Sequence, residues 1–103
     1  MTNRMIIVTA IGVLIETEHD GPLDLKTLQD KVGGHIETVP YLTEYDGERC
    51  VAYCNEYGKV NGLAFNPAAT DLWHKVTGYT QDVLLGDVVI LVGDDKFLGR
   101  TED

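Results

Sequence analysis

The sequence contains few cysteines, only Cys50 and Cys54 in 103 residues. A secreted domain of this size usually carries more cysteines, in a wider pattern. If the segment between them is a strand, both side chains point to one face and lie roughly 13 Å apart, at about 3.3 Å per residue. That separation exceeds the Cα distance of about 7 Å that a disulfide tolerates. The sequence therefore predicts thiols that are not joined in a disulfide, and a reducing, cytoplasmic location.

Basic residues are also few. The sequence has 8 Lys and Arg against 17 Asp and Glu, which gives a net charge of -9. The average field of such a chain repels phosphate backbones and anionic lipid, so neither direct nucleic-acid binding nor a membrane partner is expected. Each acidic group falls in an expected loop or terminus, which indicates a solvated surface or, alternatively, one that imitates DNA or docks on a basic partner. The groups are Glu16, Glu18, Asp20 and Asp24, then Glu44, Asp46 and Glu48, then Asp94, Asp95, Glu102 and Asp103.

No hydrophobic run is long enough to cross a bilayer, which takes about 20 residues. The apolar stretch over residues 5–16 resembles a short signal-peptide core, but it lacks a small-residue cleavage site. We therefore interpret it as a central strand buried on both faces of a sheet, with Gly12 at a bulge or bend.

Recognised catalytic motifs are missing as well. There is no glycine-rich nucleotide loop before a helix, no nucleophile elbow and no metalloprotease histidine pair. A zinc site from Cys50, Cys54 and a histidine is disfavoured by the distance between the thiols along a strand. The carboxylates of Asp94 and Asp95 are more typical of a turn than of a cation site. We predict no catalytic residue, no metal ligand and no cofactor, although an unrecognised enzyme stays open.

Two short helices are predicted from their caps. In PLDLKTLQDKVGG, Asp24 is a suitable N-cap, and Gly33 stands where a left-handed residue ends a helix, so the glycine pair is interpreted as a helix stop rather than a phosphate cradle. In NPAATDLWHKVTG, Asn66 is the N-cap, Pro67 takes the first helical position and Gly78 closes the helix.

The remaining segments favour strands. Alternation and turn residues predict strands at 35–41, in a hairpin over 49–65, at 87–93 and, as a short last strand, at 96–100, with a turn at Asp46 and Gly47. The predicted fold is a single α+β domain over residues 1–103, with a mixed, mostly antiparallel sheet of four to six strands and both helices on one face.

One stretch, residues 55–73, is unusually rich in neutral amides. Asparagines near turns commonly bond to the local backbone, and this is one interpretation of the stretch. The other is a polar binding surface beside an aromatic ring, which suits recognition of a partner or a small ligand. The candidate binding residues are Asn55, Tyr57, Lys59, Asn61 and Asn66.

Three segments, LQDKVGGHIETVPY, NEYGKVNGLAFNPAATDLW and DVLLGDVVILVGDD, occur in this order over residues 28–95. Together they resemble the successive motifs of a family of small phage, plasmid and bacterial proteins, known as domain-of-unknown-function family number thirty-eight forty-six. The resemblance implies a mobile-element setting and a single-domain accessory protein. It supplies no active site that could be carried over to residues of this chain.

Two functions from different classes follow. The first is a non-enzymatic, acidic interaction protein that binds a host protein or other host macromolecule, with affinity that falls steeply with salt. The second is a small-molecule, nucleotide-like binding protein or an enzyme, with a pocket where the glycine pair meets the Asn55 to Asn66 region. A strand edge near Pro40 or Phe97 also leaves a homodimer open.

Overall fold

The computed structural model describes residues 3–99 and contains one antiparallel sheet. The strands lie in the order β2-β1-β6-β5-β3, and β4 pairs with β5 off this path. Every strand pair in the described residues is antiparallel, so the predicted α+β class and mostly antiparallel sheet are confirmed. The strands are β1 (Asn3–Val8), β2 (Leu14–His19), β3 (Ile36–Thr38), β4 (Glu44–Tyr45), β5 (Glu48–Asn55) and β6 (Val88–Val92).

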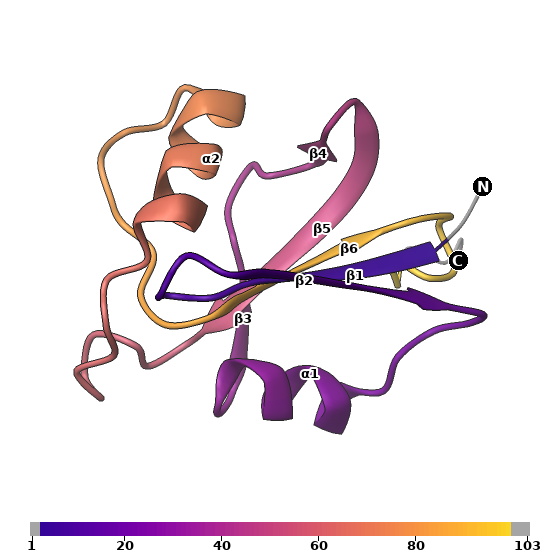
Figure 1. Ribbon diagram of the computed structural model, residues 1–103, viewed down its shortest axis with the longest axis horizontal. Coiled ribbons are helices and arrows are strands. Elements are labelled where there is room, and N and C mark those ends of the chain that lie inside the picture. The colour runs from indigo at the N-terminus through magenta and orange to yellow at the C-terminus, as the bar shows by residue number, and fades with distance from the viewer. Residues whose placement is uncertain (1–2, 100–103) are drawn as a thin grey trace.

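The two helices, α1 (Leu25–Val32) and α2 (Pro67–Thr77), cover opposite faces of this sheet (Figure 1). The prediction that both lie on one face is wrong. All five residues of β6 are buried, so its side chains fill a core on each side of the sheet. Val88, Ile90 and Val92 join the α2 core around Trp73, whereas Val89 and Leu91 join the α1 core. Such a strand needs cover on both faces.

The predicted helix ends are confirmed. The N–H of Thr27 donates to the Asp24 carboxylate at 2.8 Å, and Gly33 closes α1 in the left-handed region with φ of 78°. Asn66 and Gly78 bound α2 in the same way. Local side-chain chemistry fixes these boundaries because a cap satisfies orphan backbone groups within the same few residues.

The stretch over residues 5–16 is not one central strand. It folds as a hairpin in which β1 is central and β2 is an exposed edge strand, and Gly12, with φ of 88°, lies in the turn rather than at a bulge. The Thr9 side chain stabilises this turn by accepting from the Val13 N–H at 2.9 Å. The sequence did not predict this turn, because the residues around Gly12 are as hydrophobic as those of β1.

Two other predicted strands are absent from the described residues. The first strand of the predicted hairpin over 49–65 is present as β5, but the chain then forms turns over 56–62 and a single bridge from Phe65 to Leu85, so the returning strand and the hairpin are wrong. The reason is that β6 and β3 already occupy the two edges of β5. Residues 96–99 form a turn whose Phe97 and Leu98 pack into the α1 core, and residue 100 lies outside the described part of the chain. Neither helix in residues 3–99 has the length and apolar character to cross a membrane.

One buried side chain ties three of these segments together. Asn66 is 0% exposed, and its Nδ2 donates to the carbonyls of Val8 at 2.8 Å and Gly86 at 2.9 Å. Its Oδ1 accepts from the Ala69 N–H at 3.0 Å. The end of β1, the start of α2 and the chain before β6 therefore meet at one amide.

Replacing Asn66 tests this junction. We expect Asn66→Ala to lower the free energy of unfolding by roughly 3 kcal/mol, because it removes the helix cap and takes the side-chain donor from one buried and one partly buried carbonyl. Asn66→Asp keeps a good cap but sets a negative oxygen against those carbonyls, so it should cost at least as much. Urea unfolding measures both.

The matched control is Asn61→Ala, at an exposed turn position, which should change stability by less than about 0.5 kcal/mol. An Asn66→Asp protein as stable as the wild type would show that the amide donates to neither carbonyl.

Candidate functional site

A cavity of about 410 Å³ opens beside the end of β5. Its sides are the turn over residues 56–60 and the segment over residues 82–85, which we call the wall segment. Trp73 of α2 and Tyr79 line it from the helix side, and Glu37 of β3 and Pro40 line it from the sheet side. The volume falls within the range of small-ligand pockets, about 300–1,000 Å³.

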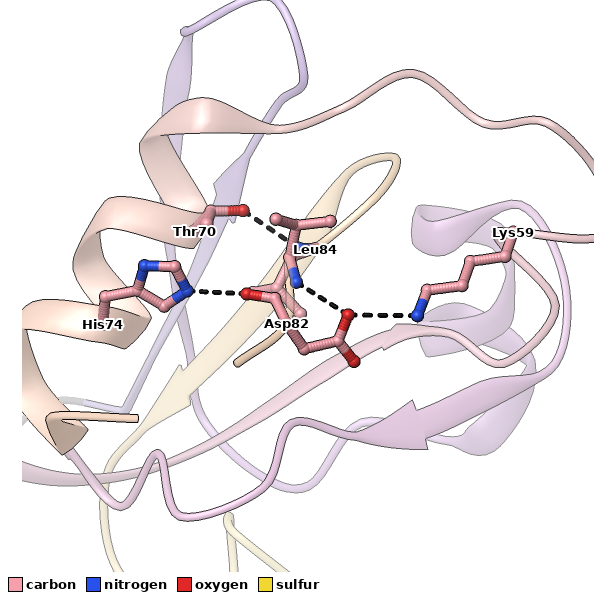
Figure 2. Close-up of polar contacts among 6 residues, drawn as sticks. Lys59, Thr70, His74, Asp82 and Leu84 are labelled. Carbon is pink, nitrogen blue, oxygen red and sulfur yellow. Dashed lines mark hydrogen bonds and ion pairs between the residues drawn. The ribbon is translucent and has the colours of Figure 1, made fainter. Parts of the chain in front are cut away.

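Two side chains one turn apart on α2 hold the wall segment (Figure 2). Thr70 Oγ1 accepts from the Leu84 N–H at 2.9 Å, and His74 Nε2 lies 2.7 Å from the Asp82 carbonyl. Since a carbonyl oxygen only accepts, the Nε2 of His74 carries the proton. Two hydrogen bonds therefore hold the wall segment to α2, in addition to the chain that connects them.

An ion pair bridges the cavity rim, where Lys59 Nζ lies 3.0 Å from Asp82 Oδ1 (Figure 2). The same oxygen accepts from the Val83 N–H at 2.8 Å. This backbone bond, and then the bond from Lys59, hold the pKa of Asp82 below its ordinary value, so the carboxylate is charged at neutral pH. Because both side chains are largely exposed, the pair contributes at most about 1 kcal/mol and leaves the rim movable.

The lining combines negative charge with aromatic rings. Three carboxylates, those of Glu37, Glu56 and Asp82, face one ammonium group, that of Lys59. Within the described residues, Glu37 and Glu56 form no ion pair. The rings are Tyr57, which is half exposed, and the Trp73 and Tyr79 pair, with centroids 5.2 Å apart.

The predicted binding residues separate into two sets. Asn55, Tyr57 and Lys59 line the cavity, whereas Asn61 and Asn66 do not. Asn61 lies on the exposed turn, and Asn66 is the buried junction described above. The predicted pocket at the glycine pair is not continuous with this cavity, because Gly33 and Gly34 border a separate hollow of about 340 Å³.

Asn55 has a structural task even though it borders the cavity. Its Nδ2 donates to the carbonyl of Val32, the last residue of α1, at 3.1 Å, and its Oδ1 accepts from the Tyr57 N–H at 2.8 Å. A Cβ at position 34 would lie 2.9 Å from this Nδ2, so Gly34 leaves room for the amide. Gly34 therefore makes room for the side chain of Asn55, whereas Gly33 ends α1.

Several residues that shape the site were not predicted. Thr70 and His74 stand at the i, i+4 spacing that places two side chains on one helix face, which is a visible signal. Their partners, however, lie 14 residues beyond Thr70 and 8 residues beyond His74, in a segment with no regular pattern. His74 is partly buried and lies within hydrogen-bond distance of the Asp82 carbonyl, and no sequence pattern pointed to Asp82.

The cavity contains no activated nucleophile. Cys54 borders it, but burial, reinforced by the charges of Glu37 and Asp82, raises the pKa of its thiol to about 11. Thiolate is the reactive form, so this cysteine is inert near neutral pH. Cys50 is buried in the α2 core and its Sγ lies 3.7 Å from the Leu42 carbonyl. Among residues 3–99, no group of three or more His, Cys, Asp or Glu side chains is arranged to hold a metal ion.

The fold and the site together define a small α+β domain with an acidic, aromatic-lined cavity at one edge of an antiparallel sheet. A family model described as Domain of unknown function (DUF3846) matches residues 3–103, and the chain belongs to this family. The predicted family resemblance is thereby confirmed, over a longer stretch than the three quoted motifs. No curated protein and no solved structure gives a significant match.

The raised pKa of Cys54 predicts a pH dependence of stability. The unfolded thiol ionises near 9.0 while the folded thiol stays protonated to about 11, so only the unfolded state gains charge in this window. The contribution of Cys54 is therefore fully present below pH 9 and lost as the pH rises to about 11. Urea unfolding across this window should show a steeper loss for the wild type than for Cys54→Ala.

Comparison with Cys54→Ala separates this effect from that of Tyr45, whose pKa is also raised by burial. Parallel losses in the two proteins would mean that the Cys54 thiol is not buried as described.

Proposed function

We propose that this protein is a non-enzymatic interaction protein that binds a basic partner protein, and that the cavity receives a Lys or Arg side chain of that partner. The observation that carries the proposal is the lining, in which three carboxylates outnumber one ammonium beside three aromatic rings. Cations are attracted to aromatic faces and to carboxylates alike, which makes both parts of the lining favourable to the same group.

The shape of a basic side chain fits this lining. Lys and Arg carry a long apolar stem that packs on hydrophobic surface while the charged head stays near polar groups. Pro40, Val83 and Leu85 offer the apolar surface, and Glu37 and Glu56 offer carboxylates that no cation of the described chain occupies. The Lys59–Asp82 pair can open at low cost because it is exposed.

A nucleotide suits the cavity less well. Its phosphates would meet three carboxylates, and the single ammonium, Lys59, is already paired at 3.0 Å. The N-terminus of α2, which could have bound phosphate, is capped by Asn66 outside the cavity. A small organic cation stays as the second candidate, since the volume of about 410 Å³ is that of a small-ligand pocket.

The partner and its setting belong to the same proposal. The family resemblance implies a phage, plasmid or bacterial source, so the basic partner is taken to be a protein of the host cell, met in its cytoplasm. The net charge of -9 supports this choice over nucleic acid, because it accelerates encounter with basic surfaces and opposes phosphate.

A short peptide with one central Arg tests the proposal against the same peptide with citrulline, its neutral isostere. In titrations of the isotope-labelled protein followed by NMR, the Arg peptide should shift the amides of Tyr57, Gly58 and Leu84 and bind about tenfold more tightly. Higher salt should weaken it. Equal affinity for the citrulline peptide would contradict the proposal.

Charge variants locate the contact. Glu56→Gln and Glu37→Gln should each weaken the Arg peptide by roughly fivefold, because each removes one carboxylate from the lining. Glu44→Gln, an exposed carboxylate outside the cavity with the same change in net charge, should leave affinity unchanged. If argininamide alone binds as tightly as the peptide, the second candidate, a binder of small cations, is favoured instead.

A further inference from the structure

The turn and edge strand over residues 11–15 expose an unusual amount of apolar surface. Ile11 is 86% exposed, Val13 47%, Leu14 56% and Ile15 45%. These four large hydrophobic residues fall within five positions, whereas the other exposed large hydrophobics are spread over the rest of the chain. Single exposed apolar residues need no explanation, but four of them within one turn and the strand that follows it point to an interaction surface.

The same segment is an open sheet edge. Strand β2 stands at one end of the strand order and, within residues 3–99, pairs only with β1. Its six residues contain no proline, and five of them are exposed. Proteins usually blunt or cover such an edge, because its unpaired N–H and C=O groups are a template for another strand.

The two faces of β2 carry different side chains. The register pairs Ile6 with Glu16 and Val8 with Leu14, so Leu14, Glu16 and Glu18 lie on the α2 face. Ile15, Thr17 and His19 lie on the α1 face. Glu16 is 3.2 Å from Arg4, whereas Glu18 forms no ion pair within the described residues. A complementary strand would need apolar residues beside the turn and basic residues further along.

We propose that an extended segment of a partner protein adds to the sheet as an antiparallel strand beside β2. Its apolar residues lie opposite Leu14 and Ile15, and its Lys or Arg residues lie opposite Glu16 and Glu18. Backbone hydrogen bonds supply affinity in this mode, and the alternating side chains supply specificity. Opposite charges facing each other across two strands stabilise the pairing.

A second copy of this chain fits the edge poorly. Antiparallel pairing of two β2 strands sets the Glu16 and Glu18 carboxylates of one copy opposite or diagonal to those of the other, and like charges so placed are destabilising. The open edge of β2 is also separate from the cavity, because β2 and β3 are the two ends of the strand order and the cavity lies on the β3 side. Either proposal can fail without the other.

A synthetic peptide tests the edge directly. The sequence Thr-Lys-Thr-Lys-Val-Val, blocked at both ends, sets Lys opposite Glu18 and Glu16 and Val opposite Ile15 and Leu14. On titration into the isotope-labelled protein, NMR shift changes and slowed amide exchange should be confined to Val13–His19 and to β1. Changes centred on the cavity amides would contradict the proposal.

Two control peptides separate backbone pairing from simple charge attraction. The peptide with Glu in place of Lys should bind at least about tenfold more weakly, as should a form of the Lys peptide N-methylated at alternate residues, which keeps the side chains but loses N–H donors. If the N-methylated peptide binds equally well, no strand is added and the proposal is wrong.

Protein variants complete the test. Glu18→Gln should weaken the Lys peptide by several fold, whereas the cavity variant Glu56→Gln should not, so failure here is distinct from failure of the cavity proposal. Sedimentation of the free protein should show a monomer. A dimer that Thr17→Pro abolishes would identify a second copy as the occupant of the edge and overturn the proposal.

Discussion

The buried amide of Asn66 is the contact on which most of the arrangement depends. One fully buried side chain serves the end of β1, the first turn of α2 and the chain before β6. Val8 lies 58 positions before Asn66 in the sequence, and Gly86 lies 20 positions after it. A hydrogen bond contributes only about 1 kcal/mol net, but a buried carbonyl left without a donor costs more, which makes alternative packings of these segments unfavourable. Asn55 plays a similar part between α1 and β5, and it also borders the cavity.

The packing of the central strands limits where a ligand or partner can contact the sheet. The central strands β1 and β6 use their side chains to fill two cores, one under each helix, so little of the sheet face is left for a ligand. The two surfaces that we propose for recognition lie at the margins of the sheet: the cavity beside β3 and the edge strand β2. Both margins combine apolar or aromatic groups with carboxylates. Part of the surplus negative charge of the chain therefore lies beside these two proposed surfaces.

Local features of the fold could be predicted, and features that depend on competition between distant segments could not. Asp24, Gly33, Asn66 and Gly78 act within a few residues of their own positions, and both helices were located from them. The hairpin over 49–65 failed because nothing local shows that both edges of β5 are already taken. The placement of both helices on one face failed although the continuous apolar run of β6 does signal burial on two sides.

The candidate site shows the same limit. The positions of Asn55 and Asn66 near turns indicated either binding or bonds to the local backbone. Both side chains also bond to distant backbone carbonyls, Asn55 to Val32, 23 positions away, and Asn66 to Val8, 58 positions away. The spacing of Thr70 and His74 is visible in the sequence, yet the wall segment that they hold carries no pattern of its own. Tyr57 and Lys59 were predicted and Glu56 is their neighbour in sequence, but the other two carboxylates of the cavity, Glu37 and Asp82, come from distant parts of the chain.

Hydrogen exchange of the Asn66 side-chain amide, followed by NMR, tests the central claim most directly. If the carbonyls of Val8 and Gly86 hold both Nδ2 protons of this buried side chain, the protons should exchange as slowly as the backbone amides of β6, because only broad unfolding exposes either set. Exchange as fast as that of the exposed Asn61 side chain would contradict the account.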